Sequence, residues 1–219
     1  MEPSFPNIPQ DETQSEANWA YSMRRNMQQI LPGLFLGPYG AAGKSKLEEL
    51  QHHGISHLVC VRMPGEEKIV RINFQDSFIC SVIEMSESRT ERILPKLKEF
   101  QLLLEDCLSS NGKLLVYCVD GMSRSAALVM GFIMFKYGLS YQEVLKYVQQ
   151  RRFCIQPSPV FEVQLKELEP ICRAEVGRRS YQPSRQKREF EDSDEIIDDH
   201  SFTKIRQKVV EDGSTMDTE

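Results

Sequence analysis

The sequence predicts an α/β domain in which a mostly parallel central sheet is flanked by helices. Three observations support this fold class: short apolar runs alternate with longer segments of helical periodicity, turn residues separate them, and polar segments lie at both ends of the chain. Alternation of strands and helices is typical of parallel sheets, because parallel neighbours need a long connection that is usually a helix. The 219 residues suffice for one such domain with tails.

Four apolar runs are expected to form strands. The turn residues Pro32 and Gly33 precede the first run, which ends near Gly37. The other three runs are rich in aliphatic residues and are bounded by polar or turn residues, as buried strands usually are. They lie at 56–61, 78–83 and 113–117.

Two helices are expected before the last of these strands. The first covers the segment around 46–50 and ends toward Gly54. In the second, over 92–108, apolar residues recur every three or four positions and therefore lie on one helical face. The pair Asn111 and Gly112 ends this helix.

Three more helices are expected after the last strand. An apolar helix runs from 125 to about 137, and Gly138 is suited to cap its C-terminus. Ser140 is a suitable N-cap for a helix over 141–150, and a final helix is expected over 161–172.

Composition divides the chain into three parts. Residues 1–27 are expected to be a flexible N-terminal arm, because most of this segment is polar and cannot bury enough apolar area to offset the entropy of ordering. Residues 28–173 form the predicted domain. Residues 174–219 carry a basic stretch and then an acidic one, and such blocks stay solvated, so we expect a disordered tail. The basic stretch is alternatively a nuclear-targeting or partner-docking segment.

The charge and the cysteine pattern exclude several classes of function. With 27 Lys and Arg against 32 Asp and Glu, the net charge is -5, so the chain lacks the basic field that binds nucleic acid. There is no membrane-length apolar run and no signal-peptide layout, so we expect a soluble intracellular protein without membrane contact. The six cysteines stand singly and the four histidines lack metal-ligand spacing. We therefore expect reduced thiols and neither a metal nor a cofactor.

The stretch 116–125 carries the clearest chemical signal. A buried strand stops there and a helix starts, and α/β sheets bind ligands at such junctions. The N–H groups of a tight loop and of the helix N-terminus form a nest for a dianion such as phosphate. Cys118 is a candidate nucleophile at this loop, and Arg124 can hold two phosphoryl oxygens at once. The predicted phosphate-binding residues are Cys118, Val119, Asp120, Gly121, Met122, Ser123 and Arg124.

The spacing of Cys118, Arg124 and Ser125 resembles the nucleophile-and-cradle motif of cysteine-dependent protein phosphatases. Further blocks at 73–83, 121–127 and 151–165 resemble the compact dual-specificity phosphatases, so the likeness covers roughly residues 30–172. The resemblance implies the dual-specificity phosphatase fold, with Cys118, Arg124 and Ser125 as catalytic residues. In this family the serine hydroxyl assists departure of the thiolate, and no metal takes part.

Two departures from the family pattern bear on catalysis. Tyr117 stands where active relatives have a histidine that organises the loop, and losing that histidine makes the Cys118 thiol harder to ionise. The family's general acid is an aspartate on an earlier loop, but the corresponding segment here, 83–88, contains no aspartate. Either Glu84 or Glu87 falls in that place, depending on the alignment of the following helix. A glutamate has suitable proton chemistry, but its longer side chain can misplace the proton.

Asp120 places a carboxylate inside an anion-binding loop. Such a charge repels phosphate unless the side chain turns away or pairs with a cation. We therefore expect the Asp120 side chain to point outward to solvent.

Residues 23–39 and 147–155 carry a narrower resemblance to a pseudophosphatase of the same family, in which glycine replaces the nucleophile. This resemblance implies a phosphoprotein-binding regulator with weak or no turnover, located in cytoplasm and nucleus. It also implies partners among mitogen-activated protein (MAP) kinases and an F-box ubiquitin-ligase subunit. The alternative is an active dual-specificity phosphatase that hydrolyses phosphotyrosine and phosphothreonine through Cys118, because this chain retains the cysteine. We expect a monomer in either case.

Overall fold

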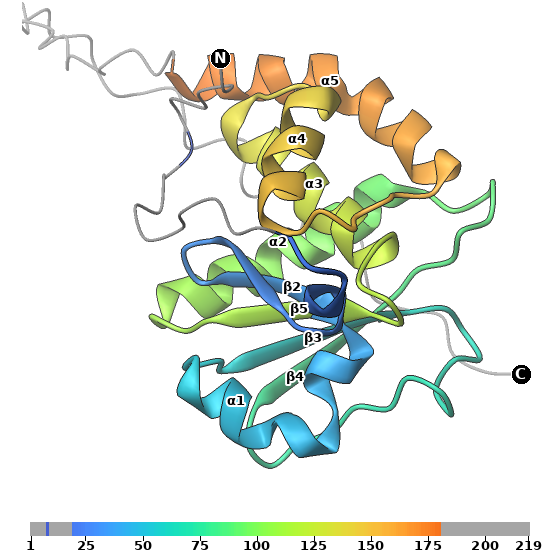
Figure 1. The fold of residues 1–219 in the computed structure, drawn as a ribbon. Helices are drawn as coiled ribbons and strands as arrows, with labels where there is room; N and C mark the ends of the chain where they lie inside the picture. The colour runs from blue at the N-terminus through green and yellow to red at the C-terminus, as the bar shows by residue number, and fades with distance from the viewer. Residues whose placement is uncertain (1–7, 9–18, 181–219) are drawn as a thin grey trace, which may run out of the picture. The chain divides into compact units, whose positions relative to one another are not determined.

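A five-stranded mixed sheet forms the centre of the computed structural model, which describes residues 8 and 19–180 (Figure 1). The strands follow the order β1-β2-β5-β3-β4, and only the β1–β2 pair is antiparallel. The predicted, mostly parallel sheet is therefore confirmed. The strands are β1 Gln28–Leu31, β2 Leu34–Pro38, β3 His57–Arg62, β4 Ile79–Glu84 and β5 Leu114–Cys118.

Strand β1 was not predicted from the sequence. It forms a hairpin with β2 around the turn at Gly33, whose φ of 78° lies in the left-handed region that favours glycine. The first half of β1 is polar and only half-buried, with Gln28 and Gln29, so it lacks the apolar run that marked the other strands.

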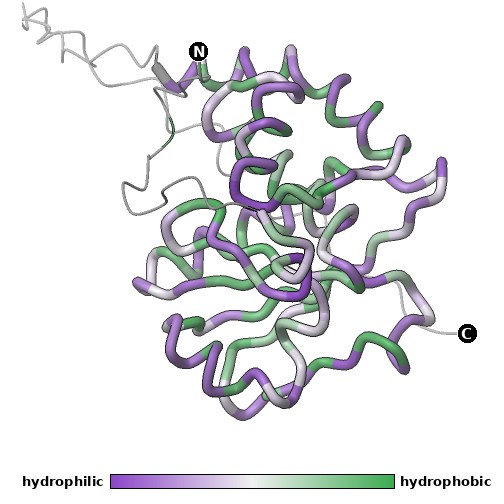
Figure 2. Tube along the Cα trace, viewed as in Figure 1, coloured by the Kyte–Doolittle hydropathy of each residue, from purple (hydrophilic) through white to green (hydrophobic). Residues whose placement is uncertain are grey.

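Five helices cover the two faces of the sheet. Helix α1 packs with Leu50 on one face, and helices α2 to α5 lie over the other (Figure 1). Figure 2 shows hydrophobic colouring concentrated along the strands, as expected for a sheet covered on both faces. The helices are α1 Leu47–His52, α2 Ile93–Ser109, α3 Arg124–Tyr137, α4 Tyr141–Arg151 and α5 Pro159–Ser180.

Helix α3 is the central helix of the larger core, because every residue from Arg124 to Met134 is buried. The predicted caps on either side of the following turn are both present. Gly138 caps α3 with a φ of 70°. The Ser140 hydroxyl accepts a hydrogen bond from the Glu143 amide, and the Glu143 carboxylate accepts one from the Ser140 amide.

The helices at the two ends of the described chain differ from the predicted boundaries. Helix α5 continues to Ser180, past the predicted end at 172 and past the domain boundary at 173. Its last turns expose polar residues and are supported by ion pairs such as Glu175–Arg178, so apolar periodicity could not reveal them. Residues 21–25, which we assigned to the flexible arm, form a short 3-10 helix. The predicted acidic tail lies outside the described residues.

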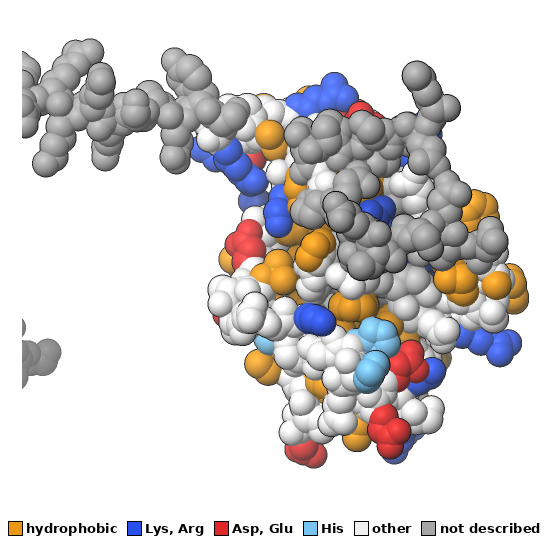
Figure 3. Space-filling view, turned by 60° about the vertical axis from the view of Figure 1, so that its left-hand side comes forward, with side chains coloured by type: hydrophobic (Ala, Val, Ile, Leu, Met, Phe, Trp, Pro, Cys, Tyr) orange, Lys and Arg blue, Asp and Glu red, His pale blue; other side chains and the backbone are white. Residues whose placement is uncertain are grey.

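Within the described part of the chain, no helix combines the length and the apolar character that a membrane crossing requires. On the face shown in Figure 3, basic and acidic side chains are interspersed among apolar ones rather than gathered into one large basic surface.

Candidate functional site

The site begins at Cys118, the last residue of β5, which is only 1% exposed. Its Sγ accepts a hydrogen bond from the Gly121 amide at 3.2 Å and another from the Ser125 hydroxyl at 3.2 Å. Amide and hydroxyl donors are the groups that stabilise a thiolate. The structure therefore places the sulfur of the predicted nucleophile within hydrogen-bond distance of an amide in the loop and a hydroxyl at the start of α3.

Gly121 allows the loop to close around this sulfur. Its φ of 66° is left-handed, and a Cβ built on it would lie 2.3 Å from the carbonyl oxygen of Gly37 in β2. Any other residue would clash with backbone that cannot move aside. The loop therefore rests directly on the end of β2, and the sequence Cys118 to Arg124 folds back on itself as the anion-binding prediction requires.

The Asp120 side chain does not point simply outward, so that expectation was wrong. The residue is exposed, but its Oδ1 accepts a hydrogen bond from the Met122 amide at 2.9 Å and lies 3.5 Å from the Cys118 sulfur. Aspartate commonly accepts a hydrogen bond from the backbone two residues on, and this local turn outweighs solvation of the carboxylate. One loop amide is thus already engaged by a resident carboxylate.

Arg124 lies buried at the start of α3 and is held by a carboxylate that sequence reasoning missed. Its Nη1 is 2.5 Å from Oε2 of Glu66, and its Nη2 is 3.2 Å from Oε1 of the same side chain. Glu66 comes from the loop after β3, which is the sheet neighbour of β5. The carboxyl ends of neighbouring parallel strands meet at one edge, and this rule was the one signal that could have found Glu66.

The ion pair shifts the pKa of both partners. Burial works to raise the pKa of Glu66, but hydrogen bonds from Arg124 and from the Met63 amide outweigh it and lower this pKa below its usual 4.5. Burial works to lower the pKa of Arg124, yet hydrogen bonding to Glu66 and the charges of Cys118, Glu66 and Glu87 raise it. Arg124 therefore stays cationic in the buried site.

The structure separates the two candidates for the general acid. Glu87 approaches the site, with its Oε1 3.7 Å from Nε of Arg124. Glu84 is the last residue of β4 and is exposed, and in the described chain it forms no ion pair with Arg124. Of the two glutamates, Glu87 is therefore the one near the predicted phosphate site.

Tyr117 points away from the sulfur, because successive residues of a strand face opposite sides of the sheet. It belongs to the core beneath α1 and stacks on Tyr39 with 6.4 Å between ring centroids. Its hydroxyl is buried beside Cys60 and has no hydrogen bond of normal geometry in the described structure. Burial and the neighbouring thiol raise the Tyr117 pKa, so the hydroxyl stays protonated.

Arg152 ties the loop to the N-terminal segment. It is completely buried, and its Nε donates to the Gly121 carbonyl at 2.9 Å while Nη2 donates to the Asp120 carbonyl at 3.1 Å. The same guanidinium donates to the carbonyls of Arg24 and Asn26, at 3.0 and 2.9 Å, and to the Gln28 side chain. A basic residue at the end of a helix usually stabilises the last carbonyls of that helix. Arg152, which follows α4, instead fixes the back of the loop.

The other five cysteines lie outside the loop, and three of them, Cys60, Cys107 and Cys172, are buried. All six are free thiols, and burial raises the pKa of Cys60 and Cys172 to about 11 each, which keeps them protonated and unreactive. No three His, Cys, Asp or Glu side chains in the described ranges are arranged to hold a metal ion.

Comparison with known proteins agrees with this geometry. Residues 34–171 match the dual specificity phosphatase catalytic domain. The serine/threonine/tyrosine-interacting protein A of Xenopus laevis is 44% identical over 182 residues, covering 82% of this chain and 80% of that protein. The human serine/threonine/tyrosine-interacting protein is also 44% identical, with the same coverage.

A solved structure gives the same result. The crystal structure of the human tyrosine phosphatase-like serine/threonine/tyrosine-interacting protein matches with a TM-score of 0.64 and 44% identity, over 67% of this chain and 97% of that one. The family match over residues 34–171 includes strands β2 to β5, the cysteine loop, helices α1 to α4 and the first part of α5. The chain therefore belongs to the dual-specificity phosphatase family and is similar, within it, to the serine/threonine/tyrosine-interacting proteins.

Proposed function

We propose that this protein is a phosphoprotein-binding regulator that holds phosphorylated side chains in the loop from Cys118 to Arg124 and hydrolyses them weakly or not at all. One observation carries the proposal: a hydrogen-bonded cysteine and a buried arginine flank a loop whose backbone is locked by Gly121. Such a loop provides the N–H donors and the bidentate cation that recognise a phosphate dianion.

The groups around the loop disfavour turnover. Asp120 brings a carboxylate close to the sulfur that must ionise and attack phosphorus. Glu87 Oε1 lies 3.7 Å from Nε of Arg124, so the carboxylate faces the cation that is expected to hold phosphate rather than a leaving oxygen. Tyr117 places no polar contact on Cys118. Each feature costs transition-state stabilisation more than it costs phosphate binding.

The resemblance to the serine/threonine/tyrosine-interacting proteins supports a proposal about partners and location. We propose that the phosphorylated partners include MAP kinases, that an F-box ubiquitin-ligase subunit also binds, and that the protein acts as a monomer in cytoplasm and nucleus. Co-precipitation with purified phosphorylated and unphosphorylated MAP kinase tests the first partner. Binding that does not depend on phosphorylation, or that survives Arg124→Met, would place kinase docking away from the loop.

An active dual-specificity phosphatase is the second candidate, and the contact between Ser125 and the Cys118 sulfur favours it. In that reaction the sulfur attacks phosphorus, the bond to the leaving oxygen breaks, and a glutamic acid protonates that oxygen. Water then hydrolyses the phosphocysteine and regenerates the thiolate, which the Ser125 hydroxyl stabilises. Glu87 is the better placed acid, so Glu87→Gln would lower turnover while Glu84→Gln would not.

Hydrolysis of a small aryl phosphate across pH, with Cys118→Ser as the matched control, separates the two functions. The proposed regulator gives a rate close to that of the serine variant, together with measurable phosphopeptide binding. A rate well above the control would establish the enzyme instead. Tyr117→His then tests the role of the missing histidine: we expect higher activity and labelling of Cys118 by iodoacetamide at lower pH.

A further inference from the structure

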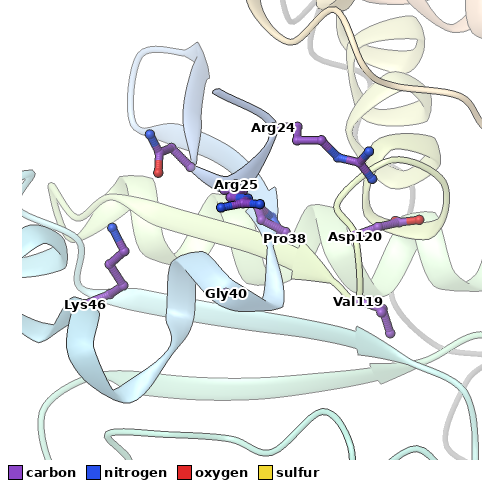
Figure 4. A pocket seen from close by; sticks show the side chains of 8 residues that line it. Arg24, Arg25, Pro38, Gly40, Lys46, Val119 and Asp120 are labelled. Atoms are coloured by element: carbon purple, nitrogen blue, oxygen red, sulfur yellow. The ribbon is translucent and has the colours of Figure 1, made fainter. Parts of the chain in front are cut away.

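A cavity adjoins the cysteine loop on the side of the N-terminal segment. It has a volume of about 530 Å³ and shares Val119 and Asp120 with the loop (Figure 4). Its other lining residues come from the short helix at 21–25 and the residue after it, from the end of β2, and from the two short 3-10 helices at 39–42 and 44–46 that follow β2. They are Arg24, Arg25, Asn26, Pro38, Gly40 and Lys46.

The cavity carries positive charge that the described chain does not neutralise. Three of its lining residues are basic, and in Figure 4 the Arg25 guanidinium lies between Arg24 and Lys46. Lys46 is paired with Glu49 at 2.5 Å, but neither arginine forms an ion pair with a carboxylate in the described ranges. The Arg24 side chain donates hydrogen bonds to the Tyr21 hydroxyl and the Met122 sulfur and lies over the Tyr21 ring.

The one acidic residue that lines the cavity is already engaged. The Asp120 carboxylate accepts a hydrogen bond from the Met122 amide and approaches the Cys118 thiol. It therefore belongs to the loop, and among residues 19–180 no carboxylate pairs with Arg25. Two guanidinium groups that have no carboxylate partner in the described ranges lie beside one anion-binding loop, and this charge favours a ligand that bears a second negative group.

The position of the cavity relative to the loop is fixed. The buried Arg152 guanidinium bonds to the carbonyls of Arg24 and Asn26 on the cavity side and to those of Asp120 and Gly121 on the loop side. One buried guanidinium thus connects the segment that lines the cavity to the cysteine loop through four backbone oxygens. A site with such fixed geometry binds a two-anion ligand without first ordering its own chain.

We propose that the cavity lined by Arg24 and Arg25 binds an acidic side chain of the same peptide whose phosphoryl group enters the loop. The chemical class is an anionic group on a residue near the phosphorylated one, either the carboxylate of glutamate or aspartate or a second phosphate monoester. This inference rests on the proposed function, because it assigns the flanking residues of the phosphorylated ligand. It predicts that the protein distinguishes phosphorylated segments by the charge beside the phosphorylated residue.

Titration with three phosphotyrosine peptides, flanked by alanine, by glutamate or by phosphoserine, tests the proposal on the full chain. We expect the two acidic peptides to bind about three- to fivefold more tightly than the alanine peptide. The order of the glutamate and phosphoserine peptides identifies the source of the second anion. Arg25→Ala and Arg24→Ala should remove this preference and leave binding of the alanine peptide nearly unchanged. Lys98→Ala on α2 removes the same charge from an exposed position outside the cavity and serves as the control.

The outcomes separate failure of this inference from failure of the proposed function. Equal affinity for all three peptides, lost on Arg124→Met, would contradict the acidic subsite and keep the phosphate loop. A preference lost equally on Lys98→Ala would show that general charge attraction, rather than the cavity, selects the peptide. If the wild-type protein binds none of the peptides, both the subsite and the proposed function are overturned.

Discussion

Glu66 and Arg124 form a bidentate ion pair in the site, with the carboxylate spanning both terminal nitrogens of the guanidinium at 2.5 and 3.2 Å. The pair joins the loop after β3 to the first residue of α3. The arginine that is expected to hold phosphate is therefore already held by the protein. Its Nε edge is the side that faces Glu87, at the longer distance of 3.7 Å.

Replacing Glu66 tests how this pair is coupled to anion binding. Glu66→Gln leaves a mostly buried cation without its counter-charge, so we expect the free energy of unfolding to fall by about 2 kcal/mol. Inorganic phosphate should restore more stability to this variant than to the wild type, because the anion replaces the lost charge. Urea denaturation with and without phosphate measures both effects. Equal stabilisation of the two proteins by phosphate would contradict the coupling.

The pH dependence of this effect has a definite sign. The pKa of Glu66 is lowered in the folded protein, so its ion pair stabilises the fold above the usual value of 4.5 and is lost as pH falls through the lowered pKa. The stability difference between wild type and Glu66→Gln should therefore shrink below pH 4.5. A difference that stays constant into the acid range would mean that the Glu66 charge is not the cause.

Asp120 is expected to weaken the anion site through its charge rather than its shape. Asp120→Asn keeps an oxygen for the Met122 amide but removes the negative charge beside the Cys118 sulfur. We predict about fivefold tighter phosphopeptide binding and iodoacetamide labelling of Cys118 at lower pH. Asp106→Asn, at an exposed position on α2, is the matched charge control. Equal changes of phosphopeptide affinity and of Cys118 labelling in Asp120→Asn and Asp106→Asn would contradict the role given to the Asp120 charge.

Tyr117 carries a buried hydroxyl that lacks a hydrogen bond of normal geometry. Tyr117→Phe removes a buried hydroxyl whose polar neighbour is the Cys60 thiol, a weak hydrogen-bond partner, so we expect the free energy of unfolding to stay level or rise by up to about 1 kcal/mol. Tyr147→Phe is the contrast, because the Tyr147 hydroxyl donates to the Ile30 carbonyl at 3.0 Å. That variant should lose about 1 kcal/mol. Chemical denaturation of the two variants measures both changes in the free energy of unfolding. A larger loss of stability in Tyr117→Phe than in Tyr147→Phe would show that the Tyr117 hydroxyl forms a strong hydrogen bond.

Arg152 is predicted to stabilise the loop and the N-terminal segment together. Lysine cannot reproduce the five hydrogen bonds of a planar guanidinium, so Arg152→Lys should lower the free energy of unfolding by about 3 kcal/mol or more. It should also increase hydrogen exchange at the amides of residues 24–28. Arg151→Lys, next to it and half-buried, is expected to cost far less. Similar losses of unfolding free energy in Arg152→Lys and Arg151→Lys would contradict the proposed role of Arg152 in stabilising the loop and the N-terminal segment.

The central part of the site could be predicted from the sequence because it is local. A buried strand, a glycine-containing loop and an apolar helix follow one another in the chain, and they place Cys118, Arg124 and Ser125 together. The dual-specificity phosphatase family and its mostly parallel sheet followed from the same residues and were confirmed.

The parts that could not be predicted depend on contacts between distant segments. Glu66 lies 58 positions from Arg124, and no spacing in the sequence connects the two. Arg152 looks like an ordinary helix-end charge until the N-terminal segment folds against it. The direction of the Asp120 side chain was wrong because a hydrogen bond to the Met122 amide competes with solvent. The choice between Glu84 and Glu87 needed the course of the loop after β4.

The most direct test of the account is calorimetric titration of a phosphotyrosine peptide into wild type, Arg124→Met and Arg173→Met, the last being an exposed arginine on α5. The central claim is that the loop from Cys118 to Arg124 holds the phosphoryl group. It predicts that wild type and Arg173→Met bind alike, and that Arg124→Met binds at least about tenfold more weakly while remaining folded. Unchanged affinity in folded Arg124→Met would contradict the claim.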